Sequence, residues 1–96
     1  MSIEEMDQAI GRMTRERKDA RTAIAVLERE IKDRGAMLSA IGGHLSSLDV
    51  DPARRVLSEV QHRGGIEKIL VVIDEYSTLR NREAELTRSI AEAGAE

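Results

Sequence analysis

The sequence predicts an all-α protein in which a long, heptad-patterned first helix, a short middle helix and a third helix form an antiparallel coiled coil or helical bundle, completed by dimerisation. Three observations predict this class. Apolar residues recur at steps of three and four through the first half of the chain, as in helices that pack along their length. The chain has one Tyr and no Phe or Trp, so aliphatic residues must form the core. A compact core is marginal at 96 residues, and association with a second chain is a common remedy.

The length and the turn residues predict one domain. We expect residues 1–96 to form a single helical domain, because this length is enough for one core and not for two. Within it, we expect helices at about residues 3–48, 52–63 and 66–93. The single proline and a pair of adjacent glycines lie at the two breaks between these helices.

The first helix has the strongest signal. Ser2 followed by Glu5 is a capping-box pattern, which predicts where the helix begins. The apolar seam that follows consists of Ile3, Met6, Ile10, Met13, Arg17, Ala20, Ile24, Leu27, Ile31, Arg34, Leu38, Ile41, Leu45 and Leu48. A helix of this length cannot cover its own apolar stripe, so it must pack against partner helices. Gly42 and Gly43 each cost roughly 1 kcal/mol relative to Ala, and a break at this point stays open.

Turn residues delimit the other two helices. Asp51 suits the N-cap and Pro52 the first helical position, so together they predict the start of the second helix. Gly64 and Gly65 predict its end. The seam of the third helix again advances by threes and fours, through Ile69, Val72, Tyr76, Leu79, Glu83, Leu86, Ile90 and Ala93.

The segment 69–73 is apolar all round and could form a helix or a buried strand. We favour a helix, because the helical period continues into Tyr76 and Leu79 and no second strand is apparent. An apolar turn of this kind should be covered on several sides. We therefore expect it to lie where three or more helices meet, with a second subunit among them.

The packing surfaces are expected to use the apolar residues of both seams. The candidates are Ile10, Met13, Ile24, Leu27, Ile31, Leu38, Ile69, Val72, Tyr76 and Leu79. Arg17 and Arg34 also occupy seam positions, where a guanidinium without a partner is costly. We expect each arginine to extend to the edge of the seam or to pair with an acid such as Glu83, and a contact of Glu83 with either arginine would fix an antiparallel register. The alternative is that they line an anion-binding pocket.

Composition argues against several other functions. The net charge of -3 does not fit a nucleic-acid protein, which needs a basic face. The lack of Cys excludes thiolate catalysis, and neither His44 nor His62 has the helical spacing of a metal site. We therefore expect no catalytic residue, metal or cofactor. The longest apolar run, residues 69–73, is too short to span a bilayer, and no signal peptide is visible, so we expect a cytoplasmic protein without a membrane partner.

One family has a similar plan. A long helix, a short helix opened by Asp and a third helix of medium length resemble the all-α chorismate mutases, which form intertwined dimers. Asp51 and Arg54 resemble the family's Asp-x-x-Arg-Glu motif, with Arg55 in place of the Glu. Arg17 and Arg34 could correspond to the two arginines of the family's first helix. The resemblance implies an arginine-lined pocket that binds a dicarboxylate.

Two parts of the family's pattern are missing from this chain. No Lys lies between Lys32 and Lys68, where the family has one between its first two helices, and the third helix contains no late Gln. From the residues themselves, we expect a non-enzymatic helical module that binds another protein through coiled-coil packing and self-associates as a homodimer. It could be an adaptor, an assembly factor or a small inhibitor of the kind that phages encode. A small enzyme similar to chorismate mutase is the alternative.

Overall fold

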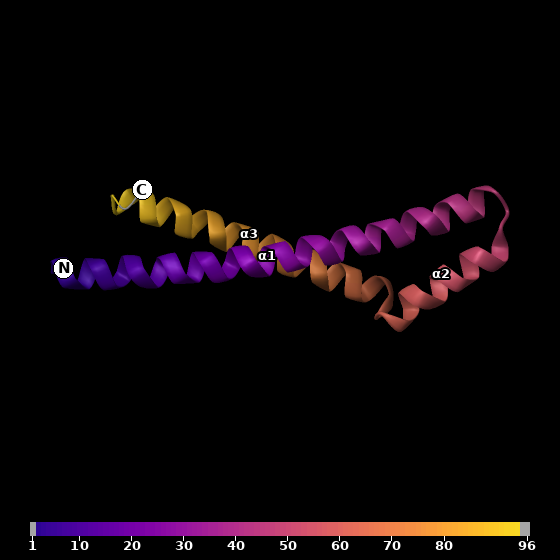
Figure 1. The fold of residues 1–96 in the computed structure, drawn as a ribbon, viewed down its shortest axis with the longest axis horizontal. Helices are drawn as coiled ribbons and strands as arrows, with labels where there is room; N and C mark the ends of the chain where they lie inside the picture. The colour runs from indigo at the N-terminus through magenta and orange to yellow at the C-terminus, as the bar shows by residue number, and fades with distance from the viewer. Residues whose placement is uncertain (1, 95–96) are drawn as a thin grey trace. The chain divides into compact units, whose positions relative to one another are not determined.

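The computed structural model describes residues 2–94 and contains three helices in the order α1 (Ile3–Ser46), α2 (Val50–His62) and α3 (Gly65–Glu92) (Figure 1). No strand occurs in this part of the chain, so the all-α class is confirmed and residues 69–73 are helical. The helices contribute to two compact units. Of the described residues, unit 1 contains 2–26 and 76–94, and unit 2 contains 27–75.

α1 begins with the predicted cap. The backbone N–H of Glu5 donates a hydrogen bond to Ser2 Oγ at 3.1 Å, which satisfies one of the free donors of the first turn. The helix continues through Gly42 and Gly43 without a break. A Cβ at either glycine would meet nothing within 4 Å, so these two residues weaken the helix without making room for a neighbour.

A Schellman motif ends α1, and its left-handed residue is not a glycine. Leu48 has φ of 60° and is exposed. Its N–H donates to the carbonyl of Leu45 at 3.1 Å, and the N–H of Asp49 donates to the carbonyl of His44 at 2.7 Å. The sequence around this turn offers glycine only earlier, so Leu48 adopts a conformation that disfavours a Cβ.

The predicted N-cap of α2 is wrong by two residues. Asp49, not Asp51, occupies the N-cap position, and its side chain makes no capping hydrogen bond. Asp51 instead lies in the first turn and pairs with Arg54 at 3.7 Å. Pro52 is tolerated there because the first N–H groups of a helix have no partner within the helix. α2 ends before Gly64 (φ 97°), and a Cβ on this glycine would lie 2.6 Å from Lys68 Cβ.

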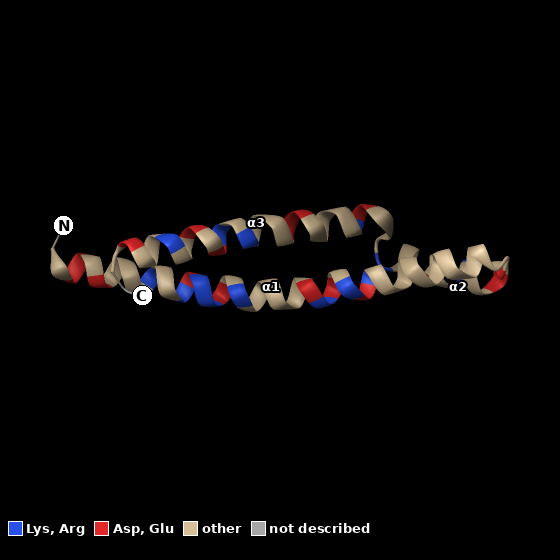
Figure 2. Ribbon diagram, turned by 90° about the horizontal axis from the view of Figure 1, so that it is seen from above, with Lys and Arg blue, Asp and Glu red and all other residues tan. Residues whose placement is uncertain are grey.

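Unit 1 is a pair of helical segments that run in opposite directions. The first part of α1 and the last part of α3 lie side by side (Figures 1 and 2). Its buried apolar residues are Ala20, Leu86 and Ile90.

Unit 2 contains the rest of α1, all of α2 and the start of α3. Its buried apolar residues are Leu27, Ile41, Ala53, Val60 and Val72, and the guanidinium of Arg34 is buried with them. Within one chain, residues 69–73 are not covered on several sides, and their expected cover by a second subunit stays a prediction. Leu70, Val71 and Ile73 are exposed, because no further helix of unit 2 lies over them. No described helix is long and apolar enough to cross a membrane.

Candidate functional site

The seam of α1 separates into two rows that the sequence does not distinguish. One row is buried and advances by seven residues, through Ala20, Leu27, Arg34 and Ile41. The other row lies four residues further along. In this second row Ile24 and Ile31 are half-buried, and Leu38 and Leu45 are exposed. One chain therefore covers only one of its two seam rows.

The remaining predicted packing residues are buried or half-buried. Val72 is buried, and the half-buried ones are Ile10, Met13, Ile69, Tyr76 and Leu79. Leu38 is the most exposed of the ten packing residues that we predicted from the sequence.

α2 has an exposed row that we did not predict from the sequence. Leu57 lies four residues after the buried Ala53, and Val50 lies three residues before it. Both are exposed although they are apolar. The signal that could have revealed them is the width of the apolar stripe on α2, which exceeds the two positions in seven that one neighbouring helix covers.

α3 has a matching row in unit 2. Ile73 lies four residues after the half-buried Ile69, and Ile66 lies three residues before it. Leu70 continues the row at one helical turn from Ile66. All three residues of the row are exposed.

The exposed rows of the three helices lie on the same side of unit 2. α2 begins beside the end of α1, where Asp49 bonds to His44, and it ends beside Asp33 and Arg34, so it runs opposite to α1. α3 also runs opposite to α1 (Figure 2). Two facing antiparallel helices are related by a two-fold axis perpendicular to their common plane. Measured from the buried residue of each helix at about 100° per residue, these positions are all turned in the same sense, by about 40–60° on α1 and α2 and by about 100–160° from Val72 on α3, so they fall on one side of that plane.

We call this surface the open face. It consists of Leu38, Leu45, Val50, Leu57, Ile66, Leu70 and Ile73, each between 41% and 60% exposed. Of the nine exposed large apolar residues described in unit 2, seven belong to it. Residues 35–46 of α1, which border it, contain no Asp, Glu, Lys or Arg. The open face is thus apolar over three helices.

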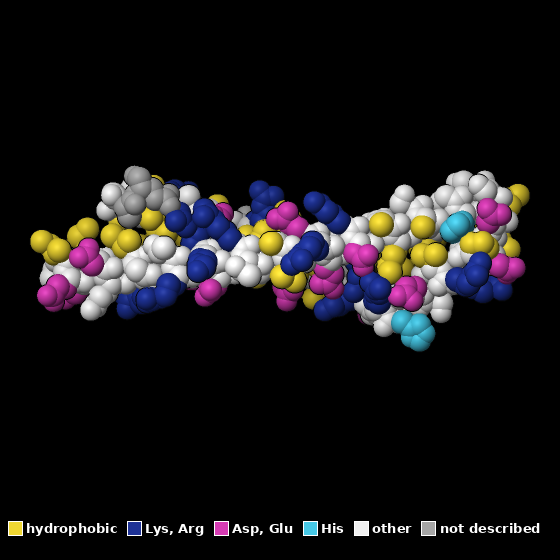
Figure 3. Space-filling model, viewed as in Figure 1, with side chains coloured by type: hydrophobic (Ala, Val, Ile, Leu, Met, Phe, Trp, Pro, Cys, Tyr) yellow, Lys and Arg dark blue, Asp and Glu magenta, His cyan; other side chains and the backbone are white. Residues whose placement is uncertain are grey.

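The opposite side of unit 2 contains ion pairs beside an apolar groove of about 400 Å³, which is lined in part by Ala36, Met37, Ala40 and Val56. Arg63 Nη1 donates to Asp33 Oδ2 at 2.6 Å, and Arg63 Nε donates to Glu59 at 3.2 Å. Asp33 and Glu59 each directly precede a buried residue, which places both on the side away from the open face. Figure 3 shows positive and negative side chains mixed along the visible surface rather than separated by sign.

Glu83 accepts a hydrogen bond from Arg21, which we did not predict, and the charge of the predicted Arg17 also acts on it. Arg21 Nε donates to Glu83 Oε1 at 2.8 Å, and Thr87 Oγ1 donates to the same oxygen at 3.0 Å. The bond from Arg21 is the main cause that lowers the pKa of Glu83, followed by the bond from Thr87, and the charge of Arg17 adds to them. Arg21 lies beside the seam, and its long side chain can reach across the pair while its stem stays on the helix surface.

Arg34 has partners in unit 2 instead. Its Nη1 donates to the backbone carbonyl of Arg63 at 2.9 Å, and its Nη2 donates to Glu30 at 3.3 Å. The residue is only 6% exposed, and its Nε has no hydrogen-bond partner. The carbonyl belongs to the C-cap of α2, so Arg34 satisfies an acceptor that the helix leaves free. The predicted contact between Arg34 and Glu83 is therefore replaced by a helix cap.

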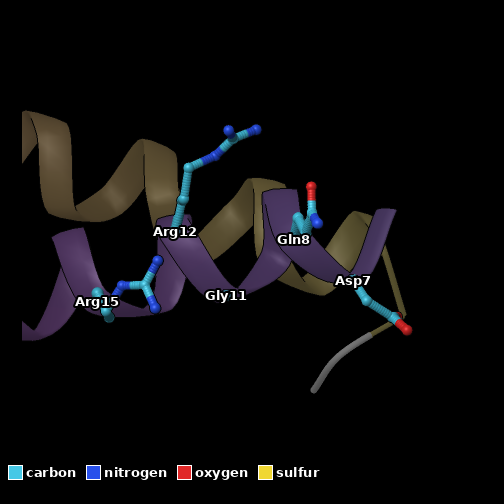
Figure 4. Close-up of a pocket in the computed structure, with 5 residues that line it drawn as sticks. All are labelled: Asp7, Gln8, Gly11, Arg12 and Arg15. Atoms are coloured by element: carbon cyan, nitrogen blue, oxygen red, sulfur yellow. The ribbon is translucent and has the colours of Figure 1, made fainter. Parts of the chain in front are cut away.

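A single pocket of one chain cannot contain both seam arginines. Arg17 and Arg34 are seventeen residues apart on one helix, which corresponds to about 25 Å. A groove of about 450 Å³ does lie near other arginines of unit 1, lined by Asp7, Gln8, Gly11, Arg12 and Arg15. All of its residues come from one stretch of α1, and the side chains of Arg12, Arg15 and Asp7 point in different directions (Figure 4). The groove offers no converging set of polar groups.

Metal-binding clusters and a second hollow were also considered among the described residues. No group of three or more His, Cys, Asp or Glu side chains within residues 2–94 could hold a metal ion. An apolar hollow of about 290 Å³ lies in unit 1, between Met6, Ala9, Ile10, Met13 and Ala93. We assign no role to it. Comparisons with protein-family models, curated proteins and solved structures gave no match.

Proposed function

We propose that the chain is a non-enzymatic protein–protein interaction module that packs its helices against those of another polypeptide. In this proposal the seam of α1 forms an antiparallel coiled coil with α2 and α3, and the open face receives the partner. The single observation that carries the proposal is the open face itself. An adaptor, an assembly factor and a small inhibitor, including a phage-encoded one, all act through surfaces of this kind, and the absence of Cys fits the cytoplasm.

The width of the apolar stripes supports a partner of helical form. A helix in a two-stranded coiled coil needs two apolar positions in seven, whereas a helix in a larger bundle needs about three. α2 meets the larger requirement with Val50, Ala53, Val56, Leu57 and Val60. A stripe of this width is covered only when helices pack on two sides of it.

The free energy gained by burying the open face also supports a protein partner. Burial of an exposed Leu or Ile contributes about 1.5–3 kcal/mol when it is complete. The seven residues of the open face are about half exposed, so a partner that covers them gains several times the stabilisation of one buried leucine. Exposed apolar patches of this kind mark sites of protein association.

Affinity capture from the native host tests the proposal. The tagged wild-type chain is compared with Leu57→Glu, which places a charge on the open face, and with Val71→Glu, which places the same charge on the opposite side of unit 2. We expect a second protein to be recovered with the wild type and with Val71→Glu and to be lost with Leu57→Glu. Equal recovery with all three chains, or no recovered protein, contradicts the proposal.

A direct assay separates this proposal from a mutase-like enzyme. The purified chain is expected to convert no chorismate to prephenate, because it lacks the family's Lys between the first two helices and the late Gln of the third helix. Turnover that disappears in Arg17→Ala would reverse the ranking of the two functions.

A further inference from the structure

We propose that α2 is the part of unit 2 that opens first by local unfolding, and that Arg34 holds it closed. Val50 and Leu57 of the open face belong to α2, so they leave that surface when the helix opens. Opening would thus act as a conformational switch on the surface that the proposed function assigns to the partner. The opening itself does not depend on that function and is tested without a partner.

α2 has few buried side chains that attach it to the rest of unit 2. Of its 13 residues, Ala53 and Val60 are buried, and neither is larger than valine. A helix of this length is marginal in water on its own, so it depends on its neighbours. α1 and α3 extend into unit 1, whereas all of α2 belongs to unit 2. A segment with so few buried apolar contacts opens at a lower free energy than the core beside it.

The two ends of α2 add little to its stability. The N-cap residue Asp49 makes no capping hydrogen bond with its side chain. Leu48 before it has φ of 60°, a conformation that disfavours a residue with a Cβ. After the helix, Gly64 and Gly65 have φ of 97° and 70°, which glycine adopts without steric cost. Opening of α2 therefore relieves Leu48 at one end and meets a flexible pair of glycines at the other.

Arg34 of α1 binds the C-terminal end of α2. Its Nη1 donates to the backbone carbonyl of Arg63, the C-cap residue of α2, at 2.9 Å, and its Nη2 donates to Glu30 of α1 itself. Arg34 is only 6% exposed, so water does not readily replace this charged donor. Its Nε has no hydrogen-bond partner, so the burial of the guanidinium is only partly compensated. Opening of α2 breaks the bond to the carbonyl and lets water reach Nε.

Arg63 provides a weaker second link at the same end of α2. Its Nη1 donates to Asp33 Oδ2 of α1 at 2.6 Å, but both side chains are exposed. Exposed ion pairs contribute little and are screened by salt. Arg54 offers a matched control, because it pairs with Asp51 at 3.7 Å within α2 itself. Loss of the Arg54 pair leaves every contact between α2 and α1 in place, whereas loss of the Arg63 pair removes one.

Native-state hydrogen exchange of the purified full chain, read by mass spectrometry at low urea concentrations, tests this opening. Amides of residues 54–62 in α2 should exchange faster than those of residues 34–41 in α1. Their rate should also depend less on urea, because a local opening exposes less surface than global unfolding. Arg34→Met should speed the exchange of the α2 amides about fivefold. Arg63→Gln should speed it about twofold, and Arg54→Gln should leave it unchanged.

Amides of α2 that match those of residues 34–41 in rate and in urea dependence overturn the separate opening of α2. Exchange of α2 that Arg34→Met leaves unchanged overturns the role of Arg34. Circular dichroism of each variant checks that the helices persist. Where Arg34→Met lowers the helix content, Arg63→Gln and Arg54→Gln decide, and equal exchange rates of α2 in these two variants overturn the proposed attachment of its C-terminal end.

Discussion

Unit 1 and unit 2 both have a buried apolar row, but they differ in what lies beside it. In unit 1 the row has an ion pair on each side: Glu16 with Arg82 at 2.8 Å, and Glu83 with Arg21 at 2.8 Å. In unit 2 the ion pairs of Arg63 lie on one side, and on the other side the open face lies beside the solvent-exposed pair of Asp51 and Arg54. Charged side chains complete a two-helix pair, because their stems cover the edge of the core while their ends stay in water. Where apolar residues stand in place of these charged side chains, as on the open face, the edge of the core stays exposed to water.

The largest expected effect tests whether unit 1 is complete within one chain. Leu86 is 2% exposed in its core. Leu86→Ala should lower the free energy of unfolding by about 2–5 kcal/mol, and so lower Tm by at least about 8 °C. Thermal denaturation measures it, with Val71→Ala as the exposed control. The loss should be the same in the Ile73→Glu background, and a loss that depends on that background would show that unit 1 also relies on a partner.

A second prediction concerns the buried charge of Arg34 in the core of unit 2. Arg34→Ala should lower the free energy of unfolding by about 1–3 kcal/mol, because it leaves the carbonyl of Arg63 without a donor and removes packed volume. Arg34→Met keeps most of the volume and should cost about 1 kcal/mol. Urea denaturation measures both. If Arg34→Met costs as much as Arg34→Ala, the guanidinium matters for its hydrogen bonds alone.

A smaller effect concerns the turn between α1 and α2 in unit 2. Leu48→Gly should raise the free energy of unfolding by about 1 kcal/mol, because glycine adopts the positive φ of this position without steric cost. Ser47→Gly is the control, since its φ is not positive and glycine only weakens the helix end there. Urea denaturation that shows no gain for Leu48→Gly would contradict the strained turn.

The smallest effect is the pH dependence that the ion pairs of unit 1 confer. The bond from Arg82 lowers the pKa of Glu16, and the bonds from Arg21 and Thr87 lower the pKa of Glu83, each below the ordinary value of 4.5. Both carboxylates therefore stabilise the fold above pH 4.5 and lose that contribution as the pH falls through their lowered values. The effect is small because these pairs face solvent.

Thermal denaturation between pH 7 and pH 3 measures this dependence. The double variant Glu16→Gln with Glu83→Gln should show a flatter decrease of Tm with falling pH than the wild type. The control is Glu75→Gln, for which no ion pair was found among the described contacts. Parallel curves for the double variant and the wild type would mean that other carboxylates govern the acid response.

The sequence was sufficient for the class of the fold and for the start of α1. The helical period extends over most of the chain, and the pairing of Ser2 with Glu5 is a local interaction that requires no tertiary contact. The start of α2 was predicted wrongly, because Pro52 is tolerated anywhere in the first turn and so does not fix the first residue. A turn in which Leu48 takes the left-handed position could not be foreseen, since that position normally selects glycine.

The open face could not be predicted from the sequence alone. A heptad pattern marks Arg34 and Leu38 as equivalent, yet one is buried and the other is exposed, because only the packing of α2 and α3 decides which row faces inward. The partner of Glu83 was missed for a related reason. We considered only seam arginines, whereas Arg21 reaches Glu83 from outside the seam. The apolar width of α2 was visible in the sequence and was the one signal that could have indicated the open face.

The uncharged run of residues 35–46 has a consequence for the steady-state abundance of the protein in a cell. Its leucines Leu38 and Leu45 are exposed, and chaperones and proteases act on apolar surfaces of this kind. Under the proposed function, a chain without its partner would then be removed faster than a chain that has one. The abundance of the partner would set the lifetime of each molecule.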